Sequence, residues 1–125
     1  MGKGQKSARV VELMSIEDFL TRVNEIQLEQ RNRTIPIVQL IILFELWKAK
    51  ERPVPLLDIQ YKYNFERFTL SRNSEMLSDA RIKDNGKIRQ GKGWITKTLI
   101  KGSDKRTKEA KLTKIGSIFA ERLFG

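Results

Sequence analysis

The stretch from Ile35 to Trp47 is the most apolar part of the chain and constrains the fold more than any other feature. Pro36, Gln39 and Glu45 interrupt it, and it is shorter than the ~20 apolar residues that a membrane-spanning helix requires. Apolar residues occur on all sides of its helical projection, which is typical of a helix surrounded by protein. We therefore expect a central buried helix from about Thr34 to Lys50, with Pro36 in its first turn, where a missing N–H is tolerated.

Another helical pattern precedes this segment. Ser15 and Asp18 resemble a capping box at the start of a helix. Apolar residues then recur at helical spacing, and the helix is expected to run to about Arg31. Residues 1–14 are predicted to form a flexible basic tail, because residues 1–9 are polar and rich in Gly and Lys.

Two short helices joined by a tight turn are expected in the middle of the chain. The first fits Leu56 to Tyr63 and the second Glu66 to about Ala80. Asn64 lies between them and can adopt left-handed backbone geometry. Asn85-Gly86 then either stops the second helix or forms a tight turn of its own.

From Trp94 the pattern changes to that of strands. The alternation from Trp94 to Ile100, a turn at Gly102, and a returning segment through Ala110 and Leu112 predict a β-hairpin. A final helix fits Lys114 to Phe124. We therefore expect a mainly α fold with a small β-hairpin (α+β) of the winged helix-turn-helix type. Its single domain would span 15–125, with the helix-turn-helix at about 56–80, a basic insert at 81–93 and the wing at about 94–113.

The positive charge is concentrated in the second half of the chain. The formal charge is +10, and residues 67–125, with 15 Lys/Arg and 6 Asp/Glu, account for +9 of it. A one-sided cationic run of this density is typical of a surface that binds a polyanion. The chain has no Cys or His, and we find no paired acids, activated nucleophile or phosphate-binding loop that would indicate an enzyme. No cofactor or metal is predicted.

Several segments resemble the MarR family of bacterial transcription regulators, with SarA-type regulators as a related comparison. The segment from Asp58 to Arg72 is similar to the family's helix-turn-helix, and Gly93-Trp94-Ile95 to the opening of its wing. Asp104-Lys105-Arg106 resembles the wing-tip Asp-x-Arg, and Leu112-Thr113-Lys114-Ile115-Gly116 the Leu-Thr-x-x-Gly that follows. The resemblance implies duplex DNA binding by a homodimer, with Asp104 supporting Arg106; that Asp104 is only a turn residue is an equal alternative.

The chain also departs from that family's pattern. Gln60 stands where the family packs an Ala, and Asn73 and Ser74 stand where it has apolar residues. About a dozen residues, Arg81 to Lys92, are inserted before the wing, and the long C-terminal dimerisation helix is absent. These departures concern the dimer and any ligand pocket more than the DNA-binding unit, and the sequence identifies no effector.

The candidate DNA-binding residues fall into three groups. On the second helix of the pair, polar residues are expected to face the major groove, where Arg pairs with guanine and Asn with adenine; they are Arg67, Thr69, Ser71, Arg72 and Asn73. For Arg67, pairing with a nearby carboxylate is an equal alternative. The wing contributes Lys97, Lys101, Ser103, Lys105, Arg106 and Lys108, with Arg106 favoured for the minor groove. The insert contributes Arg81, Lys83, Lys87, Arg89 and Lys92, either as phosphate contacts or as a basic loop without a fixed role.

The remaining expectations concern packing, partners and location. Trp47 and Trp94 are interpreted as core residues, and Tyr61 and Tyr63 as helix packing rather than pocket lining. A homodimer surface is expected on the first helix, at Phe19, Leu20, Val23 and Ile26. The protein is expected to be cytoplasmic and nucleoid-associated, without a membrane segment. The alternatives are a winged-helix module that binds another protein, for example as an accessory factor of a phage or plasmid, and a binder of RNA or single strands.

Overall fold

A computed structural model describes residues 15–30, 34–100, 102 and 107–125. The chain divides into two compact units, Met1–Thr34 and Ile35–Gly125. Within the described residues the fold is α+β, with five helices and antiparallel strands, as predicted. Among these residues no helix combines the length and the apolar character needed to cross a membrane. The predicted tail, residues 1–14, lies outside the described part of the chain.

The first unit contributes helix α2 (Ile16–Glu29). Ser15 caps it as predicted, because its hydroxyl accepts a hydrogen bond from the backbone N–H of Asp18 at 3.1 Å. The described helix ends at Glu29, two residues before the predicted end.

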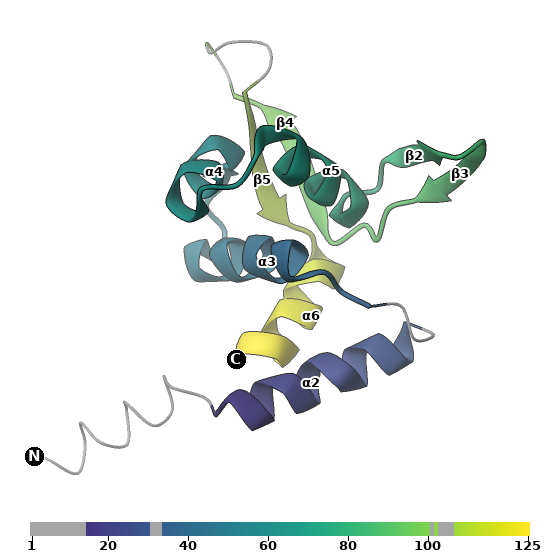
Figure 1. The fold of residues 1–125 in the computed structure, drawn as a ribbon. Helices are drawn as coiled ribbons and strands as arrows, with labels where there is room; N and C mark the ends of the chain where they lie inside the picture. The colour runs from purple at the N-terminus through teal and green to yellow at the C-terminus, as the bar shows by residue number, and fades with distance from the viewer. Residues whose placement is uncertain (1–14, 31–33, 101, 103–106) are drawn as a thin grey trace, which may run out of the picture. The chain divides into compact units, whose positions relative to one another are not determined.

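In the second unit, helix α3 (Ile37–Ala49) is the buried central helix that the apolar run predicts. Pro36 is its N-cap rather than part of its first turn. Ile42, Leu43 and Leu46 are almost completely buried. The helices α5 and α6 and the strands β1 and β5 all contact α3, which makes it the centre of this unit's core (Figure 1).

Helices α4 (Leu56–Tyr63) and α5 (Arg67–Leu77) form the predicted pair. Asn64 ends α4 in the left-handed conformation with φ of 57°, and Phe65 N–H donates to the carbonyl of Gln60 at 3.0 Å. The prediction that α5 would reach about Ala80 is wrong by three residues. Ser78 adopts an extended conformation and its hydroxyl donates to the carbonyl of Glu75, which ends the helix.

Three strands form the main antiparallel sheet in the order β1-β5-β4. Strands β4 (Ile95–Leu99) and β5 (Lys108–Leu112) form the predicted hairpin, with Lys97 opposite Ala110. The two-residue strand β1 (Val54–Pro55) pairs with β5 at the edge of the sheet. Pro55 is tolerated there because an edge strand leaves its outer side unpaired.

The segment inserted after α5 forms a separate two-stranded hairpin, β2 (Arg81–Asp84) and β3 (Lys87–Gln90). Asn85 and Gly86 connect the strands with positive φ angles of 51° and 78°. Positive φ at both central residues is the requirement of a type I′ turn, so the Asn-Gly pair explains why this segment is a hairpin. In Figure 1 the β2–β3 hairpin extends away from the rest of this unit.

Helix α6 (Lys114–Phe124) closes the core and has the predicted bounds. Thr113 caps it: its hydroxyl accepts from Gly116 N–H at 3.0 Å and donates to the carbonyl of Gly93 at 2.8 Å. A side chain on Gly116 would overlap the backbone carbonyl of Trp94. The Leu-Thr-x-x-Gly segment therefore joins the start of α6 closely to the start of β4, and Trp94 is buried there as predicted.

Candidate nucleic-acid interface

One side of α5 is buried and the opposite side is exposed. Leu70, Ser74 and Leu77 form its buried side. Arg67, Ser71 and Arg72 are exposed in its first two turns, as predicted, while Thr69 is half-buried. Phe68, which was not among the predicted site residues, is 72% exposed beside them. The first two turns of α5 therefore present two cations, a hydroxyl and an aromatic ring.

The expectation that Asn73 faces outward is wrong. Its side chain is half-buried, and its amide nitrogen donates to the carbonyl of Thr69 at 2.8 Å. Its amide oxygen accepts from Nε2 of the fully buried Gln39 at 3.2 Å. Both polar atoms form hydrogen bonds inside the protein, so Asn73 links α5 to Gln39 of α3.

Lys97 is half-buried against α5, on the cleft side of the hairpin and not on its outside, where it was expected. It shares a face of β4 with the buried Ile95, because alternate residues of a strand face the same side. Its Nζ donates to Ser74 Oγ of α5 at 2.8 Å. Burial, together with the charge of Lys108, lowers the pKa of Lys97 below its ordinary value of 10.5. The hairpin thus places a partly desolvated ammonium group against α5.

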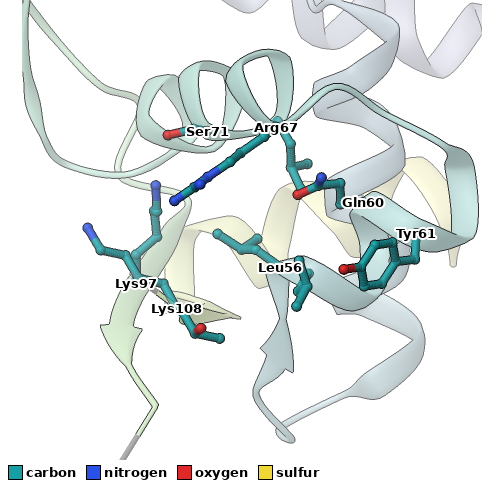
Figure 2. A pocket seen from close by; sticks show the side chains of 10 residues that line it. Leu56, Gln60, Tyr61, Arg67, Ser71, Lys97 and Lys108 are labelled. Atoms are coloured by element: carbon teal, nitrogen blue, oxygen red, sulfur yellow. The ribbon is translucent and has the colours of Figure 1, made fainter. Parts of the chain in front are cut away.

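A cleft lies between α4, the start of α5 and the β4–β5 hairpin (Figure 2). It has a volume of about 680 Å³. In Figure 2 the side chain of Arg67 extends from α5 towards the space that also receives Lys97 and Lys108 from the hairpin. The full lining is Leu56, Leu57, Gln60, Tyr61, Arg67, Leu70, Ser71, Lys97, Thr107 and Lys108.

The composition of this lining makes the cleft suitable for an anion. Its three charged side chains are all cationic, and Ser71 and Gln60 add hydrogen-bonding groups. Like charges that line a concave site together attract a ligand of opposite sign. Tyr61, predicted to pack between helices, is instead 73% exposed on the wall of the cleft.

Tyr63 does pack, as predicted, through contacts that the sequence did not reveal. Its hydroxyl donates to Glu45 of α3 at 2.6 Å, and Lys62 Nζ lies 3.1 Å from the same carboxylate. Burial and the hydrogen bond to Glu45 raise the pKa of Tyr63. These contacts hold the C-terminal turn of α4 against α3.

The β2–β3 hairpin carries exposed cations and is fixed to the end of α5. Arg81, Lys83, Lys87 and Arg89 are all exposed. The chain leaving the hairpin returns along the C-terminal carbonyl groups of α5, which would otherwise lack partners. Backbone N–H groups of Lys92, Gly93 and Trp94 donate to the carbonyls of Met76, Ser78 and Leu77, at 2.9, 3.0 and 2.8 Å.

Lys92 differs from the other cations of the predicted insert. Its Nζ donates to Oε1 of the buried Gln39 at 3.4 Å and lies 5.5 Å from the centre of the Trp94 ring. Lys92 is half-buried, so the prediction that it contacts phosphate is wrong. It instead contacts Gln39 and Trp94 inside the protein.

Five residues predicted to bind or support DNA contacts on the wing lie outside the described residues: Lys101, Ser103, Asp104, Lys105 and Arg106. The residues expected at a dimer surface lie on α2, but Val23 and Ile26 are buried within the chain and Phe19 is half-buried, so of these four only Leu20 is exposed. The homodimer stays a prediction.

Within the described residues, no cluster of acidic side chains could hold a metal ion. Comparison with protein-family models, with curated proteins and with solved structures finds no match to this chain.

Proposed function

We propose that this protein is a winged helix-turn-helix protein that binds specific sequences of double-stranded DNA. In this proposal it regulates transcription, as the MarR regulators that its sequence resembles do. In this account α4 and α5 form the helix-turn-helix, α5 reads the major groove, and β4–β5 is the wing. The observation that carries the proposal is the exposed start of α5 beside a cleft whose charged lining is entirely cationic.

The exposed residues at the start of α5 have the chemistry of base recognition. Arg72 can pair with O6 and N7 of guanine, Ser71 can bond to several base edges, and Phe68 can contact a thymine methyl group. The reading helix of a helix-turn-helix protein contacts bases mainly with its N-terminal residues. The acidic Glu75 and Asp79 follow in the last turn of α5 and just after it, beyond those residues.

The cleft offers a place for the DNA backbone. A phosphate there would receive charge-assisted hydrogen bonds from Arg67 and Lys108. Because Arg67 comes from α5 and Lys108 from the hairpin, one phosphate would fix both elements on the duplex. The exposed cations of β2–β3 add further phosphate contacts.

The biological assembly in this proposal is a homodimer formed through the exposed apolar residues of α2, which include Leu20. Two copies of α5 would then lie about 34 Å apart, one turn of DNA, on an inverted repeat. Nucleoid association follows from binding DNA.

A salt titration tests whether the protein binds the DNA backbone. We expect log affinity for duplex DNA to fall linearly with log salt, with a slope of about −0.9 for each phosphate neutralised. Lys108→Ala should weaken binding to all sequences and make the slope about one unit shallower. Lys114→Ala, which removes an exposed cation of α6 outside the cleft, is the matched control. A flat titration, or equal effects of the two variants, would count against the proposed interface.

A further inference from the structure

We propose that the β2–β3 hairpin is a second DNA-contacting arm, which inserts Ile88 between base pairs of the minor groove beside the site read by α5 and thereby bends the duplex. This inference rests on the proposed DNA binding and adds a contact and a distortion of the DNA that α5 and the β4–β5 hairpin do not provide.

The pairing register of the hairpin separates its residues into two unlike faces. Residues paired across an antiparallel ladder share a face, and successive pairs alternate between faces. Arg81 pairs with Gln90 and Lys83 with Ile88, so one face consists of these four residues. Ile82, Arg89 and Lys87 belong to the other face. The four residues of the first face, here called the Ile88 face, include two cations.

Ile88 is the apolar centre of that face. It is 67% exposed, whereas Ile82 on the other face is half-buried. Ile88 lies two residues after the Asn85-Gly86 turn, near the end of the hairpin that extends furthest from the body of the unit (Figure 1). Ile88 is therefore a largely exposed branched side chain near the tip of the hairpin, with Lys83 directly opposite.

The charge around Ile88 selects a polyanion as the partner. Arg81 and Lys83 lie on the same face, and Lys87 and Arg89 flank Ile88 along the strand. Proteins that bend DNA through the minor groove combine cations that contact phosphates with an apolar wedge that partly unstacks a base step. The Ile88 face has both parts, and its cations would hold the wedge against the groove.

The base of the hairpin fixes its position relative to α5. Gly91 N–H donates to the carbonyl of Ala80 at 2.9 Å, and the Gln90 side chain donates to the carbonyl of Asp79 at 2.5 Å. A side chain on Gly91 would overlap the carbonyl of Ser78, so the two segments are in close backbone contact. In the proposed complex α5 lies in the major groove, and the arm that leaves its C-terminal end reaches the neighbouring groove of the same duplex.

The inference is tested by measuring DNA bending separately from DNA binding. A duplex of three helical turns, about 30 bp, carries a fluorescence donor and acceptor at its two ends, and energy transfer reports the bend. Binding is measured on the same duplex by fluorescence anisotropy. The proteins are the full chain, Ile88→Ser, and Ile118→Ser as a control that removes an equally apolar and similarly exposed side chain from α6.

We expect the full chain and Ile118→Ser to increase energy transfer on binding. Ile88→Ser should bind within about threefold of the full chain, because its cations remain, but should leave the duplex nearly straight. An Ile88→Ser complex that bends DNA as much as the full chain, or a full chain that binds without bending it, would overturn the wedge. If no protein binds the duplex, the proposed DNA binding itself is wrong.

Discussion

Gln39 is the residue that joins the buried helix α3 to the exposed helix α5. Its amide donates to Asn73 of α5, and its carbonyl oxygen accepts from Lys92, so one fully buried side chain satisfies polar groups from two other segments. Such buried networks define one position for the elements that they join, because each unpaired member would be destabilising.

Replacing Gln39 by leucine tests this role. The apolar side chain would leave the Asn73 amide oxygen and the Lys92 ammonium without this partner, so we expect the free energy of unfolding to fall by about 1–3 kcal/mol. Urea denaturation followed by circular dichroism measures the loss, with Gln60→Leu at the half-buried cleft wall as the comparison. Equal stability of the Gln39→Leu variant and the wild type would contradict the network.

The partly buried ammonium group of Lys97 should make the stability of the fold depend on pH. Since burial lowers its pKa in the folded state below the ordinary value of 10.5, the unfolded chain binds more protons between these two values. The contribution of Lys97 to the free energy of unfolding therefore rises with pH across that window. We expect Lys97→Met to be at least as stable as the wild type at pH 7, and this advantage to shrink as the pH approaches 10.5.

Urea titrations of both proteins across that window provide the measurement, with Lys111→Met, on the opposite and exposed face of the hairpin, as control. An advantage that grows with pH would show that the Lys97 pKa is not lowered.

The close approach of Gly116 to Trp94 can be tested by adding a side chain at position 116. A methyl group there would meet the backbone carbonyl of Trp94, which cannot move without disturbing β4. We expect Gly116→Ala to destabilise the fold by about 1–3 kcal/mol through overpacking, despite the better helix propensity of Ala. Thermal denaturation should show this loss, and Ser117→Ala, an exposed neighbour in α6, should change stability little. A Gly116→Ala protein as stable as the wild type would rule out the close approach.

At the scale of elements, the sequence predicts best those helices whose ends are marked by a residue next to them in the chain. Pro55 before α4, Asn64 after it and Thr113 before α6 set boundaries that the structure reproduces. The end of α5 was missed because its last turn is capped by residues 92–94, which are distant in sequence. Strand β1 was missed because two residues show no periodicity.

The site was predicted less completely than the fold. Exposure of Arg67, Ser71 and Arg72 followed from helical spacing, but the inward direction of Asn73 depends on Gln39, which no local pattern identifies. The inward direction of Lys97 could have been found, since the strand alternation that buries Ile95 also places Lys97 on the same face. The cleft requires the packing of α4 against the hairpin and has no sequence signature.

The role of the whole β2–β3 hairpin can be tested by shortening it. Deleting Lys83, Asp84, Lys87 and Ile88 leaves Ile82-Asn85-Gly86-Arg89, and the Ile82–Arg89 pair is of the same hydrogen-bonding type as the pair that flanks the turn now. We expect this shortened protein to fold with unchanged thermal stability, to lose DNA bending as Ile88→Ser does, and to retain base preference. Loss of base preference in the folded, shortened protein would show that the hairpin, and not α5, reads sequence.

At the scale of the whole molecule, both hairpins are attached to α5. Lys97 of β4–β5 contacts Ser74 in the third turn of α5, and β2–β3 follows its C-terminal end. The positive charge of residues 67–125 is carried largely by these hairpins and very little by α5 itself. In the proposed complex the hairpins therefore supply electrostatic attraction to DNA, while α5 supplies selectivity between sequences.

Selection of binding sites from a random pool of duplex DNA, with the wild type and Arg72→Ala in parallel, tests the central claim that α5 reads base sequence. We expect an enriched motif for the wild type and a relaxed preference at one of its base pairs for Arg72→Ala. A pool that stays random with the wild type, or an identical motif recovered with both proteins, would contradict it.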